Sequence, residues 1–250
     1  MDTALTAFLL GIVEGLTEFL PVSSTGHLIL ATELFGYDPA QWAQFNIVIQ
    51  LGAILAVVVT YWSLFVKMGF GLLRRESEAV HFVRNILIAF MPAALIGLAV
   101  KDVIDVMLGS PMVVAVALIV GGVAMLVLER TIKPAPDRGV AALSWRTALG
   151  IGFVQCLAMV PGTSRSGATI LGALAMGVGR KTAAEFSFFL AVPTMLGAAT
   201  VKIVSEPEAL LSGGALVGCD NSAIGFVTSF VVALVVIHLF VAFVRTRGFA

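Results

Sequence analysis

Five long apolar stretches and two interrupted ones organise the chain. The long stretches approach the ~20 residues that an α-helix needs to cross a ~30 Å hydrocarbon core at 1.5 Å per residue. They are continuously apolar rather than alternating, so they predict membrane-spanning helices and not the strands of a membrane barrel. They lie near 42–62, 84–100, 112–128, 183–204 and 223–244.

Segments 4–36 and 147–178 have a different pattern. Each is apolar, is then interrupted by a turn of Pro, Ser, Thr and Gly, and becomes apolar again. This pattern predicts two half-length helices that enter and leave the membrane by the same face, because irregular backbone is tolerated there only inside protein or beside a cavity. Two full spans with polar kinks remain an alternative.

The basic residues support the first interpretation. Cytoplasmic loops carry an excess of Lys and Arg, so the loops that hold most of them are expected inside and those near Lys101 and Lys202 outside. Both interrupted segments then begin and end on one side of the membrane, and the two sides differ. Of 15 Lys and Arg residues, four lie in 67–84, four in 130–146, two at 180–181 and two at 245–247.

The two interrupted segments also resemble each other. One match is between Pro21-Val-Ser-Ser24 and Pro161-Gly-Thr-Ser164. A second is between Gln44-Phe-Asn46 and Glu185-Phe-Ser187, which are one residue further apart in the chain than the first pair. Similar halves that insert from opposite faces form an inverted repeat, whose functional site is expected near the midplane where the broken helices meet.

Composition agrees with a membrane protein. The chain is 59% hydrophobic and 12% charged, with a mean hydropathy of +1.05. We therefore predict an all-α polytopic membrane protein of one transmembrane domain, 1–250, with repeat one about 1–128 and repeat two about 140–250. The zero net charge gives no reason to expect a nucleic acid partner, and Cys156 and Cys219 lack the spacing of a zinc site or a disulfide framework.

Two carboxylates lie at the end of the first apolar run. Glu14 and Glu18 are four residues apart, so a helix places them on one face. Two such groups in a medium of low dielectric constant cannot both ionise cheaply unless a cation lies beside them. Mg²⁺ or Ca²⁺ would fit, because these ions take carboxylate and phosphate oxygens. A proton relay in a transporter, which would also use His27, is the competing interpretation.

Hydroxyl groups follow the carboxylates. Ser23, Ser24 and Thr25 stand between Pro21 and Gly26-His27, where a helix start would direct its positive end at an anion. Serine or histidine can be the nucleophile in phosphoryl transfer when a base or a metal assists. The alternative is that these hydroxyls bond to helix carbonyls or to neighbouring helices.

A guanidinium stands in the second polar turn. Arg165 lies between Ser164 and Ser166, with Thr169 one helical turn later, and its planar fork suits phosphate oxygens. It could instead neutralise the glutamates as a structural ion pair. The set of carboxylates, hydroxyls, imidazole and guanidinium indicates metal-assisted attack on a phosphate, and its depth in the bilayer implies a substrate with a lipid tail.

At these residues the chain resembles the undecaprenyl-diphosphate phosphatase family of the bacitracin-resistance type. Glu14-Gly-Leu-Thr-Glu-Phe-Leu-Pro-Val-Ser-Ser-Thr-Gly-His27 is similar to that family's first motif, and Pro161-Gly-Thr-Ser-Arg-Ser-Gly-Ala-Thr169 to its second. The resemblance extends through 48–57 and 185–193. It implies hydrolysis of C55 isoprenoid diphosphate to the monophosphate at the outer side of the bacterial plasma (inner) membrane. This reaction recycles the lipid carrier of cell-wall synthesis and confers bacitracin resistance.

The resemblance also implies residue roles. The partners it implies are a polyprenyl diphosphate substrate and membrane lipids, with a homodimer left open, and the alternative function is transport of polyprenyl phosphate. Members of the family carry one more apolar span after the region that corresponds to 245–249. The implied catalytic residues are Glu18, Ser24, His27 and Arg165, the implied metal ligands are Glu14 and Glu18, and the residues expected around the diphosphate are Ser23, Thr25, Ser164, Ser166 and Thr169.

Overall fold

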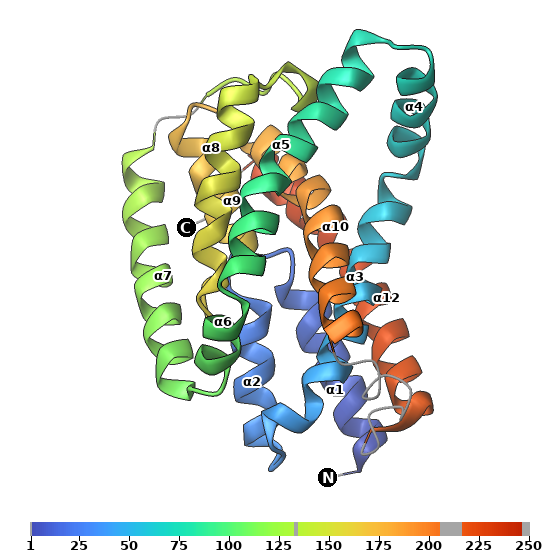
Figure 1. Cartoon of the computed structure of the whole chain (residues 1–250), viewed down its shortest axis with the longest axis vertical. Helices are drawn as coiled ribbons and strands as arrows, with labels where there is room; N and C mark the ends of the chain where they lie inside the picture. The colour runs from blue at the N-terminus through green and yellow to red at the C-terminus, as the bar shows by residue number, and fades with distance from the viewer. Residues whose placement is uncertain (1, 133–134, 206–216, 247–250) are drawn as a thin grey trace.

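The computed structural model describes residues 2–132, 135–205 and 217–246, so 247–250 of the predicted C-terminal region lie outside it. Within those ranges the chain consists of α-helices joined by short turns, as predicted, and Figure 1 shows them running lengthwise. The α-helices are α1 (Thr3–Thr17), α2 (Ser24–Leu34), α3 (Ala43–Thr60), α4 (Trp62–Leu73), α5 (Ser77–Ala99), α6 (Lys101–Leu108), α7 (Pro111–Thr131), α8 (Trp145–Gln155), α9 (Arg165–Ala175), α10 (Arg180–Ser205) and α12 (Gly218–Thr246), and the 3₁₀ turns are η1 (Pro39–Trp42), η2 (Val140–Ala142) and η3 (Cys156–Met159).

Each of the five predicted spans is a helix long and apolar enough to cross a membrane. The prediction is therefore confirmed, and the chain is a multi-pass membrane protein. Candidate spans in the described ranges are Pro39–Thr60, Ser77–Ala99, Pro111–Thr131, Arg180–Ser205 and Gly218–Phe243.

The two interrupted segments form helical hairpins. Helices α1 and α2 contain 15 and 11 residues, and α8 and α9 contain 11 each. At 1.5 Å per residue these helices are about 16 to 22 Å long, too short to cross a ~30 Å core. In Figure 1, α1 starts at the lower end of the molecule, whereas α8 starts at the upper end. The prediction of half-length helices is confirmed, and the alternative of full spans is wrong.

The returning helices of the two hairpins begin in the same way. Ser23 precedes α2 and accepts a hydrogen bond from the Gly26 backbone N–H at 3.4 Å. Ser164 precedes α9 and accepts one from the Gly167 N–H at 3.0 Å. Both are N-cap serines, which satisfy a free amide of the first helical turn. Ser23 and not Ser24 is therefore the counterpart of Ser164, and the sequence alignment of the two turns was wrong by one position.

The returning helices also end in the same way. Gly36 and Gly177, at the same separation as the two cap serines, have φ of 83° and 78°. The N–H of each glycine bonds to the carbonyl three residues before it, and the next N–H bonds to the carbonyl five residues before it. This is the Schellman arrangement, in which glycine takes the left-handed conformation at low cost. The returning helices of the two hairpins thus share their length, N-cap and C-terminal turn.

Close helix packing supports the first hairpin. Small residues let helix backbones approach within membranes. A Cβ atom on Gly52 of α3 would lie 2.5 Å from the Phe226 carbonyl oxygen of α12, and one on Gly15 of α1 would lie 2.8 Å from the Ser229 carbonyl oxygen. The Ser229 hydroxyl also donates to the Ile49 carbonyl at 2.7 Å. Helices α1, α3 and α12 therefore form one tightly packed unit.

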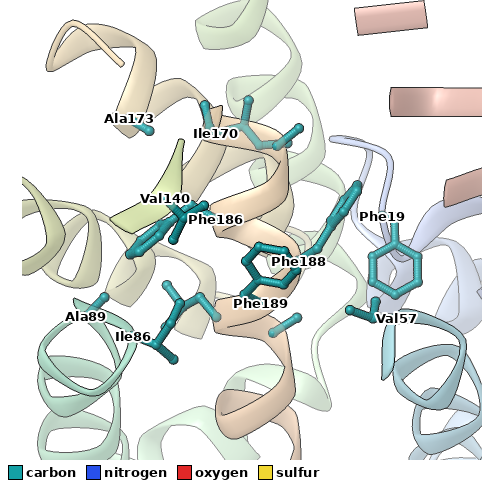
Figure 2. Close-up of a cluster of buried hydrophobic side chains, with 14 of the residues drawn as sticks. Phe19, Val57, Ile86, Ala89, Val140, Ile170, Ala173, Phe186, Phe188 and Phe189 are labelled. Atoms are coloured by element: carbon teal, nitrogen blue, oxygen red, sulfur yellow. The ribbon is translucent and has the colours of Figure 1, made fainter. Parts of the chain in front are cut away.

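Aromatic side chains pack the turn between α1 and α2 against α10. Phe19 directly follows Glu18, and its ring meets Phe188 edge to face, with centroids 5.2 Å apart. Figure 2 shows this pair beside Val57, with Phe189 on the same helix as Phe188. Phe19 and Phe188 are fully buried. Phe19 is thus anchored in the core immediately after Glu18.

Candidate active site

The two polar turns meet at an ion pair. Glu18 caps the C-terminus of α1, and Arg165 is the first residue of α9. Arg165 Nη2 lies 2.6 Å from Glu18 Oε1, and the side chains are only 13% and 5% exposed. A buried pair at this distance is a charge-assisted hydrogen bond in a medium of low dielectric constant. The contact joins the two halves of the repeat directly.

Other groups from α10 hold the guanidinium in place. Arg165 Nη1 donates to the Ser187 carbonyl at 3.0 Å, and Nη2 lies 3.5 Å from the Met195 sulfur. The Nε–H is buried and has no hydrogen-bond partner among the described residues. Nη1 and Nη2 of Arg165 therefore bind protein atoms, while the Nε–H remains able to donate to a ligand.

Glu18 also receives the hydroxyl of Ser24. Ser24 Oγ donates to Glu18 Oε2. Ser24 is the first residue of α2, as Arg165 is the first residue of α9. The repeat thus brings its two equivalent positions to the two oxygens of one carboxylate. The sequence predicts Glu18, Ser24 and Arg165 in one site, and in the structure Ser24 and Arg165 both contact Glu18.

Glu14 lies one helical turn before Glu18. Its side chain is 0% exposed, and neither carboxylate oxygen has a hydrogen-bond partner among the described residues. Buried carboxylate oxygens without donors are costly, so the site suits a positive ligand. No group of three His, Cys, Asp or Glu side chains gathers in the described ranges. A cation here would therefore need phosphate or water oxygens in addition to Glu14 and Glu18, which is how Mg²⁺ is commonly held.

His27 is one turn along α2 from Ser24, and its side chain is exposed. Its Nδ1 lies 2.8 Å from the Ser23 carbonyl oxygen. A carbonyl can only accept, so Nδ1 carries a proton and Nε2 is the nitrogen left for chemistry. Ser23 itself has φ of 66°, a left-handed conformation uncommon for residues other than glycine. That strain turns the chain from the α1 end into α2.

The hydroxyls expected at the diphosphate are mostly engaged within the protein. Ser23 and Ser164 are the N-caps described above, and Thr25 is half-buried in the first turn of α2. Ser166 donates to the Leu20 carbonyl at 2.7 Å. Thr169 Oγ1 lies 2.9 Å from the Arg165 carbonyl oxygen and 2.6 Å from the Ser187 hydroxyl. These contacts shape the turns and orient Arg165, and direct binding of phosphate by these hydroxyls stays a prediction.

Helix α7 forms a wall behind both turns. Gly162 has φ of 94°, and a Cβ atom there would overlap the Val114 carbonyl oxygen of α7. A Cβ atom on Gly26 would lie 3.2 Å from the Leu118 side chain of the same helix. The glycines of both motifs therefore allow the turns to approach one shared surface.

A cavity of about 480 Å³ extends from Arg165 toward α6. Of the four predicted catalytic residues, all of them described, Arg165 is the one that lines it. Its walls are mainly apolar and include Phe90, Gly97, Met159 and Val201, while Lys101 and Lys202 lie at the end that borders α6. An apolar cavity that ends at the buried guanidinium of Arg165 suits an amphiphile with an anionic end.

Sequence reasoning missed three contributors to the site. Ser187 and Met195 of α10 contact Arg165, and Gln155 at the end of α8 lines the cavity beside it. In the sequence, Ser187 stands out only as part of the repeat. A polar side chain inside an apolar run was the available signal for Ser187 and Gln155, whereas nothing distinguishes Met195 from packing methionines.

The fold and site define a polytopic membrane protein in which a buried Glu18–Arg165 ion pair joins two helical hairpins. Residues 7–250 match the family model described as Bacitracin resistance protein BacA, and the chain belongs to this family. A relative named undecaprenyl-diphosphatase from Novosphingobium aromaticivorans is 64% identical over 249 residues, covering 100% of this chain and 92% of the relative. Proteins of the same name from Sphingopyxis alaskensis and Rhizorhabdus wittichii are 55% and 54% identical, and the matches cover 100% and 98% of this chain and 92% and 91% of those proteins.

Proposed function

We propose that this protein is an undecaprenyl-diphosphate phosphatase, which hydrolyses the C55 isoprenoid diphosphate to the monophosphate and inorganic phosphate. The names of its relatives support this activity over transport of the lipid. The observation that carries the proposal is the contact of Ser24 and Arg165 with one buried carboxylate, Glu18. This arrangement combines a hydroxyl, an acceptor for its proton and a cation for phosphate.

In the proposed reaction Arg165 binds the diphosphate and stabilises the negative charge that develops on the transferred phosphoryl group. Ser24 Oγ attacks the terminal phosphorus, and Glu18 Oε2 accepts the hydroxyl proton. The new Oγ–P bond forms as the bond from that phosphorus to the bridging oxygen breaks, and the lipid monophosphate leaves. Water then cleaves the Oγ–P bond, which releases inorganic phosphate and restores the Ser24 hydroxyl.

His27 is the proposed proton carrier. Its Nδ1–H is fixed on the Ser23 carbonyl, so Nε2 can take a proton from water or give one to the leaving oxygen. Glu14 and Glu18 are the proposed ligands of a divalent cation, Mg²⁺ or Ca²⁺. When bound, such an ion would neutralise charge on the diphosphate oxygens. The orphaned oxygens of Glu14 support this assignment.

The proposed location is the bacterial inner membrane, with the site open to the periplasmic side. The basic loop residues support this orientation, since they concentrate on the connections at the α4 end of the molecule, opposite α6 (Figure 1). At that location the activity would recycle the lipid carrier for cell-wall synthesis and confer resistance to bacitracin. Measuring the mass of the purified protein in detergent would test whether it forms a homodimer.

The test is release of inorganic phosphate from farnesyl or undecaprenyl diphosphate by the detergent-purified protein, with Mg²⁺ or Ca²⁺ and with chelator. We expect metal-dependent release by the natural protein and a loss of at least about a hundredfold in Ser24→Ala, because attack by a positioned nucleophile is removed. Thr200→Ala, on an exposed hydroxyl that bonds only the Leu196 carbonyl of its own helix, α10, is the matched control. Absence of release from folded natural protein would reject phosphatase activity. Near-normal turnover by Ser24→Ala would reject only serine as nucleophile.

A further inference from the structure

Gln155 presents an unusual buried amide. It is the last residue of α8, and its side chain is 2% exposed. The Thr194 hydroxyl oxygen lies 3.4 Å from Gln155 Oε1 and 2.7 Å from the Leu190 carbonyl oxygen. Gln155 Nε2 has no hydrogen-bond partner among the described residues. An amide nitrogen carries two N–H groups, so whichever way the amide is turned toward Thr194, at least one N–H lacks a protein acceptor.

This amide lies at the inner end of the cavity. Gln155, Thr194 and Arg165 line the same space, and the cavity continues for about 16 Å, or eleven residues of helix, toward Ser205. Arg165 contributes the second unpaired donor, its Nε–H. Two buried donors without acceptors destabilise the empty site, and an anion that accepts from both would relieve that cost.

The repeat gives an independent reason to assign a ligand to this position. Gln155 follows Glu14 at the same separation as that between the two cap serines and between the two terminal glycines. Both side chains are buried on the entering helix of their hairpin, and both keep side-chain polar atoms without partners among the described residues. Glu14 offers acceptors, which suit a cation, whereas Gln155 offers a donor, which suits an anion.

We propose that Gln155 is a phosphate-binding residue, whose amide N–H donates to a phosphoryl oxygen of the lipid diphosphate held by Arg165. This inference rests on the proposed function. A neutral amide adds a directed hydrogen bond without further charge, so it holds the phosphoryl group against Arg165 and still allows the released phosphate to leave. The lipid diphosphate and inorganic phosphate share the phosphoryl oxygens that Gln155 would recognise.

The experiment compares Gln155→Met and Gln155→Glu with the natural protein, using farnesyl diphosphate as substrate and inorganic phosphate as inhibitor. Loss of one hydrogen bond to a charged group corresponds to about a tenfold lower kcat/KM or more in Gln155→Met, with weaker inhibition by phosphate. Gln155→Glu has nearly the same shape but sets a carboxylate against the phosphate. We expect a larger loss near neutral pH that lessens, relative to the natural protein, as the pH falls and the new carboxyl is protonated.

Gln44→Met is the matched control, because Gln44 has a buried, unpaired amide oxygen and does not line the cavity. A merely structural Gln155 would change the unfolding temperature while leaving phosphate inhibition and the pH profile as in the natural protein, and that result overturns the proposal. If Gln155→Met does not fold, Gln155→Glu decides by its pH profile. If the natural protein releases no phosphate from any lipid diphosphate, the proposed function fails first, and binding of radiolabelled inorganic phosphate to natural and Gln155→Glu protein then tests Gln155 alone. Equal binding would reject it.

Discussion

The two hairpins have similar backbone conformations in their returning helices but carry different charged side chains. Helices α2 and α9 have the same length, cap and terminus, yet the first hairpin carries the carboxylates Glu14 and Glu18, whereas the second carries Gln155 and Arg165. Glu18 has Met159 as its counterpart in the second hairpin, and Met159 lines the apolar cavity. The comparison teaches that one framework, used twice, supplies opposite electrostatic surfaces, so that a charged ligand can lie between them.

The largest effect is expected from removing the Glu18–Arg165 ion pair, which connects the two hairpins. Glu18→Ala should abolish phosphate release and lower the free energy of unfolding by about 3 kcal/mol, because it leaves the buried Arg165 charge unpaired. The double variant Glu18→Ala/Arg165→Ala should recover part of that stability while remaining inactive. Unfolding in detergent and the phosphate assay measure both quantities.

Lys67→Ala serves as the control for that cycle. Its ion pair with Glu78 is exposed on both sides, so we expect less than about 1 kcal/mol. Strictly additive losses in the Glu18 and Arg165 variants would mean that the two side chains do not interact.

A smaller effect separates conformation from packing in the second hairpin. Gly162 and Gly177 both have positive φ, 94° and 78°, but a Cβ atom meets Val114 at Gly162 and nothing within 4 Å at Gly177. Gly177→Ala should cost about 1 to 2 kcal/mol for the left-handed backbone alone. Gly162→Ala should cost a further 1 to 3 kcal/mol or so, from overlap with α7. Equal losses of stability at the two positions would show that α7 does not press on the turn.

The smallest expected effect compares the caps. Ser164→Ala removes an acceptor at 3.0 Å from the Gly167 N–H and should cost about 1 kcal/mol of stability. Ser23→Ala removes a longer bond of 3.4 Å and should cost less. Ser23→Gly, which suits the φ of 66°, should be as stable as the natural protein or more so. Thermal unfolding ranks the three, and a larger loss at Ser23 than at Ser164 would contradict the ranking.

Much of this architecture could be predicted from sequence because it depends on periodicity and charge. The spans follow from apolar length, and the opposed hairpins follow from the distribution of Lys and Arg. The convergence of Glu18, Ser24 and Arg165 could be expected from the cost of isolated charges in a membrane. The register of the repeat could not, because Pro21 and Pro161 suggested an alignment that the caps at Ser23 and Ser164 correct.

Other features depended on three-dimensional packing. The polar side chain of Ser187 within an apolar run could mark the residue, but its contact with Arg165 uses the backbone carbonyl, which any residue type would supply. The position of Gln155 beside Arg165 depends on how η3 redirects the chain after α8. Binding of a divalent cation by Glu14 and Glu18 and the direct phosphate contacts of Thr25, Ser164, Ser166 and Thr169 stay predictions.

The Glu18–Arg165 bond spans 147 positions of the chain. A ribosome that adds 5 to 20 residues per second reaches the arginine about 7 to 30 s after the glutamate. During that interval the nascent first half must keep its acidic groups protonated, hydrated or shielded by the insertion machinery, since no counter-ion from the second half has yet been synthesised. Membrane insertion of the first half is therefore a stage at which Glu18 lacks the partner that it has in the folded protein.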